Sequence, residues 1–271
     1  MTTGLISGIP DDDYHASPAL SSSGARRLLK VAPAQWLWEQ THPQPPADHF
    51  EQGSAVHTLA LGVGARVVEV RAKDRRSKAV QQEFEDIRFE GGIPLLSREF
   101  DAAHAMAEAA RSHPRLGIAL RRGEPELSGW WTDTETGVEC RLRPDALYRP
   151  HGERGRALAV DLKTSESADP LEFVRSVVKF GYDQQHDWIV SGLAAHGIDA
   201  ACVFLVVSKQ PPYLASAVEL VPAAVDRGRR RNREALELFR RCTGSGEWPG
   251  HGDDIHQIDL PAWAYKQEDH R

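Results

Sequence analysis

The spacing of apolar and polar residues changes near the middle of the chain. In the first half, the pattern is typical of helices: Ser21, Ser22 and Ser23 provide caps before a short amphipathic run, and Pro33 ends it. The same reading predicts helices over residues 21–30, 33–40, 50–61, 77–89 and 97–112. We therefore expect a helical N-terminal region up to about residue 122.

After Gly123, short runs that alternate or stay apolar are separated by turns, which is typical of neighbouring antiparallel strands. Strands are predicted over residues 127–132, 138–147, 157–163, 201–208 and 214–220. Helices are predicted over residues 170–179, 182–196 and 222–241. A tight turn at 134–137 joins the first two strands, and a polar loop at 149–156 joins the second to the third. The order predicts an α/β fold, with a mixed sheet flanked by helices.

The chain shows no internal repeat, and we expect one domain over residues 1–271. Within it, residues 1–122 form the helical region, residues 123–243 the α/β core, and residues 244–271 a tail. The tail is rich in Gly, His and Asp. We expect it to be loop-like and to pack through Trp263 and Tyr265.

Composition narrows the class of protein. Hydrophobic residues make up 41% and charged residues 27% of the chain, as in soluble globular proteins. No apolar run approaches the roughly 20 residues that cross a bilayer, so no membrane partner is expected. The three cysteines are far apart, which excludes a zinc ribbon or a cysteine-held iron–sulfur cluster. Their spacing suits a reducing cytoplasm.

The net charge of −6 is an obstacle for any nucleic-acid hypothesis, because binding a polyanion needs positive surface. Two local runs are basic. Residues 66–78 carry six Lys or Arg against two acids, and residues 226–234 carry five Arg against two acids. Each run is either a DNA-binding face or an ordinary solvated surface.

Candidate chemistry lies in the segments that end at Asp145 and Lys163. Side chains alternate along a strand, so Asp161 and Lys163 share one face, and Arg141, Arg143 and Asp145 would share another. If the two strands pair, two carboxylates and an ammonium group converge, and such hard oxygen ligands suit Mg²⁺. Most Asp-x-Lys tripeptides are surface ion pairs. Asp161, however, closes the apolar run 157–160, where an unpartnered carboxylate would be costly to bury.

Four short motifs in order resemble RecE-type (exonuclease VIII-like, phage-type) exonucleases of the PD-(D/E)XK nuclease superfamily. They are Gly53-Ser-Ala-Val-His57, Thr136-Gly-Val-Glu-Cys-Arg-Leu-Arg-Pro-Asp145, Asp161-Leu-Lys-Thr164 and Tyr182-Asp-Gln-Gln185. The resemblance covers roughly residues 9–245 and also includes Leu20-Ser-Ser-Ser-Gly24. It implies a restriction-endonuclease-like core.

The resemblance implies roles for individual residues. The metal ligands would be His57, Asp145, Asp161, the Leu162 backbone carbonyl and, less firmly matched, Glu126. Lys163 would be the catalytic lysine, with Tyr182 and Gln185 lining the site from one helix face. The chain departs from the family pattern at Ile189, where the family commonly has tyrosine. A contact to DNA or to Lys163 is therefore in doubt.

The resemblance implies a Mg²⁺-dependent exonuclease, with Mn²⁺ as the alternative metal, that digests linear double-stranded DNA from 5′ ends in recombination. The implied partners are DNA ends, a single-strand-annealing recombinase and further copies of the chain, with Trp36 and Trp38 as interface candidates. The implied location is the cytoplasm of a bacterial host, for a protein that is bacterial or phage-encoded. Two alternatives stay open: a PD-(D/E)XK endonuclease or single-strand nuclease, and a non-catalytic DNA-binding module with a decayed site.

Overall fold

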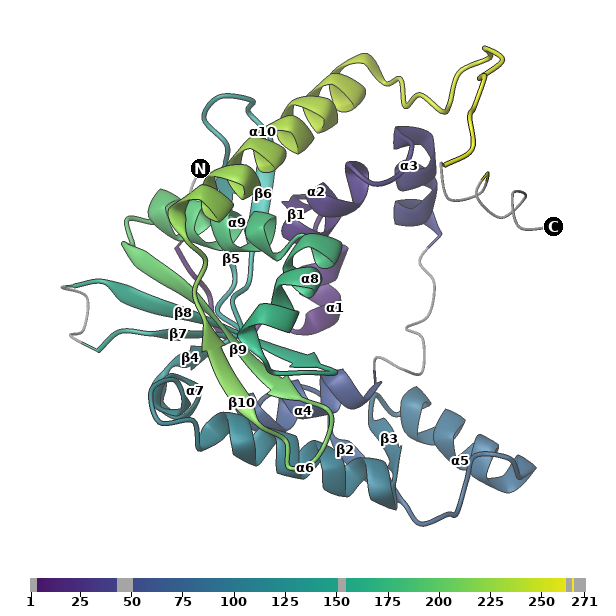
Figure 1. Ribbon diagram of the computed structural model, residues 1–271, viewed down its shortest axis with the longest axis vertical. Coiled ribbons are helices and arrows are strands. Elements are labelled where there is room, and N and C mark those ends of the chain that lie inside the picture. The colour runs from purple at the N-terminus through teal and green to yellow at the C-terminus, as the bar shows by residue number, and fades with distance from the viewer. Residues whose placement is uncertain (1–3, 43–50, 151–154, 262–264, 266–271) are drawn as a thin grey trace.

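A mixed five-stranded sheet lies at the centre of the computed structural model, which describes residues 4–42, 51–150, 155–261 and 265 (Figure 1). Its strand order is β10-β9-β8-β7-β4. The strands are β4 (Glu124–Pro125), β7 (Ala146–Tyr148), β8 (Ala157–Ser165), β9 (Ala200–Ser208) and β10 (Ala215–Val218). β8 and β9 run parallel, and the other neighbours are antiparallel. The predicted α/β fold with a mixed sheet is confirmed.

Two small sheets accompany the central one. One has the order β1-β6-β5 and consists of β1 (Leu20–Ser21), β5 (Gly129–Thr132) and β6 (Glu139–Leu142). The other pairs β2 (Val67–Val70) with β3 (Ile93–Leu96) in parallel. The expectation that the N-terminal half is purely helical missed this second sheet, because each of its strands has only four residues.

Helices cover both faces of the central sheet (Figure 1). One face carries α2 (Ser22–Leu28), α8 (Pro170–Phe180), α9 (Tyr182–Ala195) and α10 (Pro222–Ser245). The other carries α4 (Glu51–Leu61), α6 (Ser97–Arg111) and α7 (Gly117–Arg122). The remaining helices are α1 (Asp11–Ala16), α3 (Pro33–Thr41) and α5 (Lys78–Phe89). No described helix is both long and apolar enough to cross a membrane.

Alternation along β8 decides which side chains reach the site. Val160 and Leu162 point into the core under α4 and α6, whereas Ala157 and Ala159 point toward α9. Asp161 and Lys163 continue the second set, so both lie on the α9 side of the sheet. The predicted common face of Asp161 and Lys163 is confirmed.

The segment predicted as one strand over residues 138–147 is two strands in two different sheets. β6 ends at Leu142 and pairs with β1 and β5, whereas β7 starts at Ala146 and pairs with β8. Pro144 lies in the break and has no N–H to donate to a ladder. The two predicted antiparallel pairings, β5 with β6 and β7 with β8, are confirmed, but they lie in different sheets. A single three-stranded meander is therefore wrong, and so is the single shared face assigned to Arg141, Arg143 and Asp145.

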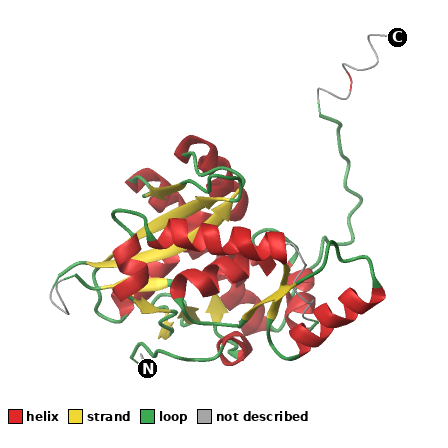
Figure 2. Ribbon diagram, turned by 90° about the horizontal axis from the view of Figure 1, so that it is seen from below, coloured by secondary structure: helices red, strands yellow, loops and turns green. Residues whose placement is uncertain are grey.

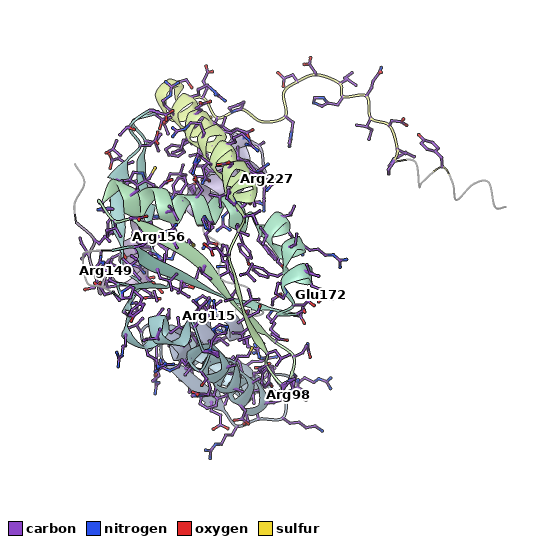
Figure 3. The ribbon with its side chains drawn as sticks, turned by 60° about the vertical axis from the view of Figure 1, so that its left-hand side comes forward. Arg98, Arg115, Arg149, Arg156, Glu172 and Arg227 are labelled. Atoms are coloured by element: carbon purple, nitrogen blue, oxygen red, sulfur yellow. The ribbon has the colours of Figure 1, made fainter. Side chains whose placement is uncertain are left out.

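α9 and α10 are joined by buried polar contacts. Asp183 pairs with Arg227, labelled in Figure 3. Asp187 pairs with Arg229 at 3.2 Å and accepts a hydrogen bond from Asn232 at 3.0 Å. Gly228 lets the helices approach, because a Cβ built there would lie 2.1 Å from the Asp183 carbonyl oxygen.

Gly228→Ala is therefore expected to lower the free energy of unfolding by about 2 kcal/mol or more, the range of an overpacked core site. Thermal denaturation measures this change. Gly244→Ala is the matched control, because Gly244 lies in the same helix and a Cβ added there would meet nothing within 4 Å. The control should raise stability by up to about 1 kcal/mol through helix propensity. Equal effects at the two positions would contradict the close-approach argument.

The end of the chain packs differently from the prediction. Trp248, rather than Trp263 or Tyr265, anchors it: the Trp248 ring stacks on Trp36 at 5.3 Å between centroids. Tyr265 is 49% exposed, and Trp263 lies outside the described residues. Trp36 is buried in the core and so is not available as an interface residue, whereas Trp38 is exposed.

Candidate active site

The site forms where β7 has ended and β8 continues. The last pair between these strands is Ala146 with Val160, so the backbone of β8 beyond that point lacks a β7 partner. Asp145, just before β7, takes the vacant place: its Oδ2 accepts a hydrogen bond from the Leu162 N–H at 2.6 Å. A strand residue presents its N–H and C=O to the same neighbour, so the Leu162 carbonyl lies on this edge too.

His57 reaches the same edge from α4. Its Nδ1 lies 3.4 Å from Asp145 Oδ2, and its side chain is 30% exposed. Two residues that are 88 positions apart in the chain are thus brought together by the packing of α4 against β8. The structure therefore places His57 beside Asp145, where the sequence-based hypothesis required it.

Asp161 is the most deeply buried member, with a side chain only 2% exposed. Its Oδ1 accepts a hydrogen bond from Gln185 Nε2 at 2.6 Å, and its Oδ2 faces the Lys163 ammonium group in an ion pair. Lys163 Nζ also lies over the Tyr182 ring, 4.9 Å from its centroid. Asp161, Lys163, Gln185 and Tyr182 thus form one connected set.

Burial and neighbouring charges shift the ionisation of this set. Burial raises the pKa of Asp145; His57 opposes that rise, and the nearby Asp161 carboxylate adds to it. Burial alone would lower the pKa of Lys163, but Asp161 and Asp145 outweigh it and raise that pKa. The lysine is held as an ammonium ion between carboxylates.

Glu126 lies at the edge of the set. Its backbone N–H donates to the Asp145 carbonyl at 3.0 Å, and its φ of 48° is unusual for a residue other than glycine. Burial and the nearby Asp11 raise the pKa of Glu126, and Arg143 opposes this. A half-buried carboxylate on a strained backbone beside Asp145 is typical of a functional position.

Ile189 is buried in the core between α9 and the small sheet. An aromatic contact to Lys163 is nevertheless present, because Tyr182 supplies it from the first turn of the same helix. The departure at Ile189 therefore leaves Lys163 with an aromatic neighbour.

The donor set fits a divalent cation with oxygen ligands. Among the residues that the structure describes, no three His, Cys, Asp or Glu side chains form a metal-binding group by themselves. Mg²⁺ needs no such cage, because it takes one or two carboxylates and keeps several waters. Asp161 is buried and Asp145 is half-buried, and a cation would relieve the repulsion between the two carboxylates. The site therefore fits Mg²⁺ or Mn²⁺ better than a three-ligand zinc centre.

Sequence reasoning missed a polar cavity of about 260 Å³ beside this set. It is lined by residues from α1, α2, β6 and α9 and by Glu126, and its polar lining includes Asp11, Ser22, Arg26, Arg141 and Gln185. In the described part of the chain, Ser22 Oγ, Arg141 Nε and Gln185 Oε1 are buried there without hydrogen-bond partners. Burial lowers the pKa of Arg26, and the Asp161 carboxylate opposes this. The signal available in the sequence was a serine run with an arginine one turn later.

The two basic runs are mostly engaged in structural contacts. In α10, Arg227 and Arg229 bind acids of α9, Arg231 donates to Gln184, and Arg233 pairs with Asp133 at 2.7 Å. In residues 66–78, arginines pair with nearby acids, as Arg75 does with Glu99 at 2.8 Å. Reversing the charge of the α10 arginines would thus break the α9–α10 interface. A loss of DNA binding in such a variant would therefore not show that these arginines contact DNA.

The fold and the site together define the class. Pro144-Asp145, directly before β7, and Asp161-Leu162-Lys163, on the adjacent antiparallel strand β8, form the PD-(D/E)XK pattern. The chain belongs to the family described as PDDEXK-like domain of unknown function (DUF3799), whose model matches residues 21–261.

One solved structure has a similar fold over nearly the whole chain. The chain is similar to the crystal structure of a “Putative exonuclease” from Eubacterium rectale, with a TM-score of 0.63 and 11% identity. That match covers 95% of this chain and 98% of the other. The structure of SSO0001 matches with a TM-score of 0.29 and 14% identity over 69% of this chain and 84% of the other, and supports no argument. No curated protein matches the sequence.

Proposed function

We propose that this protein is a metal-dependent DNA exonuclease that hydrolyses linear double-stranded DNA from 5′ ends in recombination. The observation that carries the proposal is the meeting of Asp145, Asp161 and Lys163 on the edge of β8 that β7 leaves unpaired. The name of the Eubacterium rectale protein agrees with an exonuclease.

The residues have separate tasks in this proposal. Asp145, Asp161, His57 and the Leu162 carbonyl hold the divalent cation, with Glu126 beside them. When bound, the cation supplies Lewis-acid stabilisation of charge on the phosphate oxygens. Lys163 adds a second positive charge next to the same phosphate. Gln185 holds Asp161 in place through its 2.6 Å hydrogen bond, and the Tyr182 ring supports Lys163.

The cavity at Ser22, Arg26 and Arg141 supports action at a phosphorylated end. Ser22 Oγ and Arg141 Nε are buried donors without partners that a terminal phosphate would satisfy beside the Arg26 guanidinium, which also donates to the Ser22 and Phe180 carbonyls. Asp11 and Glu126 line the acidic part of the cavity's polar surface. The cavity shares Gln185 with the metal-binding set, so a phosphate held there would lie next to that set. A 5′-phosphate is the end group that we assign to it.

We expect Arg26→Gln to remove the preference for 5′-phosphorylated over 5′-hydroxyl ends, with a loss of about tenfold or more in the rate on phosphorylated DNA. Initial rates on the two substrates measure this. Arg27→Gln is the control, because Arg27 is exposed and pairs with Glu39 outside the cavity. An unchanged preference in Arg26→Gln would exclude this cavity as the phosphate site.

The function itself is tested by digesting linear and covalently closed circular duplexes with Mg²⁺, with Mn²⁺ and with a chelator. We expect digestion of linear DNA only, dependence on the cation, and earlier loss of a 5′ label than of a 3′ label. Rapid cutting of closed circles would indicate the endonuclease alternative. Binding without cutting under every condition would indicate the non-catalytic alternative.

The remaining assignments are parts of the same proposal. The protein would act in the cytoplasm of a bacterial host on ends that a single-strand-annealing recombinase then uses. It would act as an oligomer around the DNA, which would explain processive digestion by topology. Co-purification with such a recombinase would test the partner.

A further inference from the structure

α8 exposes an apolar stripe in addition to the face that it buries. Phe173 and Val177 pack on the sheet. Leu171, Val174 and Val178, at i, i+3 and i+7, form a neighbouring stripe that is 84%, 55% and 59% exposed. Glu172, labelled in Figure 3, Arg175 and Lys179 lie on the polar side of the helix. A contiguous exposed apolar stripe of this kind marks a candidate interaction surface.

The C-terminal tail is the second exposed apolar element. After Pro249, whose carbonyl accepts a hydrogen bond from the Ala34 N–H, the tail runs away from the body (Figure 2). Ile255 and Ile258 are 96% and 86% exposed, and Leu260 is also exposed. From residue 250 onward, the hydrogen bonds of the described residues stay within the tail, such as Tyr265 to Asp259 at 2.5 Å.

The family match extends to residue 261 and so includes this tail. A segment that belongs to the family's domain but has no hydrogen bond to its own body is expected to find its contacts on another molecule. We propose that the tail of one copy docks its Ile255, Ile258 and Leu260 side chains on the α8 stripe of a second copy. The two elements thereby form the interface of a homo-oligomer.

Charge favours this pairing. The tail carries Asp253 and Asp254, both exposed, next to its first isoleucine. α8 carries Arg175 and Lys179 beside its stripe, and the described part of the chain gives neither of them an acidic partner. Opposite charges that flank complementary apolar surfaces set the register of the contact.

The geometry favours a second copy over the chain's own α8. Residues 250–261 in extended form span roughly 40 Å, enough to reach across to a neighbour. In the structure they point outward instead of lying back across α2 and α8 (Figures 1 and 2). The C-terminal end of α8 contacts α2 near the site, where Arg26 donates to the Phe180 carbonyl at 2.8 Å.

The first test is the mass of the full chain in solution, measured by light scattering without DNA, so that it does not depend on nuclease activity. We expect a multiple of 30.0 kDa. Ile255→Ser with Ile258→Ser, and separately Leu171→Ser with Val178→Ser, should each raise the dissociation constant about tenfold or more. Phe89→Ser is the control: Phe89 is 94% exposed but lies on α5, so the mass should not change.

All substituted residues are exposed, so each variant should fold. Circular dichroism checks that it does. A monomeric parent, or either double variant with the parental dissociation constant, overturns the proposal.

The second test identifies the contact itself. Val174→Cys and Ile258→Cys are made in separate chains and mixed under oxidising conditions; the native cysteines are all buried. A covalent dimer that forms from the mixture, and not from either variant alone, is expected. When both substitutions are in one chain, an internal disulfide in a monomer would show that the tail covers its own α8, and would overturn the proposal. The absence of any cross-link would overturn it as well.

Discussion

Asp161→Asn is expected to abolish DNA cleavage, with a loss of about 10³-fold or more. The reason is that the substitution removes a metal-binding carboxylate, and a metal contributes several kcal/mol to transition-state stabilisation at about 1.4 kcal/mol per tenfold in rate. Asparagine keeps the shape of the side chain, and its amide oxygen can still accept the hydrogen bond from Gln185. The fold should therefore survive. Initial rates on linear duplex measure the loss, and calorimetric titration with Mn²⁺ should show weaker binding.

Asp101→Asn is the matched control, because Asp101 is an exposed carboxylate on α6, away from the site. It should retain the parental rate and the parental metal affinity. Cleavage by Asp161→Asn at the parental rate would show that the site has been assigned to the wrong residues. Lost cleavage with unchanged metal affinity would show that Asp161 does not hold the cation.

Lys163 gives the second large effect. Both Lys163→Met and Lys163→Arg are expected to lose cleavage by about 10²-fold or more, a typical loss for a positioned catalytic group. Methionine removes the charge. Arginine keeps the charge but presents it on a wider planar group that cannot occupy the same point. Initial rates under saturating DNA measure both losses, and Lys78→Met, at an exposed lysine of α5, is the control.

Stability separates a catalytic lysine from a structural one. Lys163 is 17% exposed and forms an ion pair with the buried Asp161, so its replacement also affects the melting temperature. Lys163→Met should lower the melting temperature, since it leaves a buried carboxylate unpaired, and Lys163→Arg should lower it less. If Lys163→Arg restored cleavage along with stability, the lysine would be a structural ion-pair member.

Much of the site was predictable from local pattern. The alternation over residues 157–163 places Asp161 and Lys163 on one side of a strand, whatever packs against it. The spacing of Tyr182 and Gln185 on one helix was equally local, and both contact that side. The predicted bounds of α5, α6, α8 and α9 lie within a residue or two of the observed ones, because each begins or ends at a clear serine, proline or glycine signal.

The local sequence could not show what the arginines of α10 contact. A run of five arginines in nine residues looks the same whether it faces DNA or a neighbouring helix. The structure shows that they face α9, because Asp183 and Asp187 are buried there and need cationic partners. Gly228 belongs to the same contact, because only a residue without a Cβ lets α9 and α10 approach this closely.

The sequence by itself determined the residue types, the strand alternation and the helix faces that make up the candidate site, because these depend on neighbours only a few positions away. Tertiary structure decided how they meet. The break at Pro144 moves β7 into the central sheet and frees Asp145 to bind the Leu162 N–H. α4 brings His57 to the same edge, and α2, β6 and α9 enclose the polar cavity. Such contacts join residues far apart in the chain, and they depend on which buried surfaces pack together, which no local spacing records.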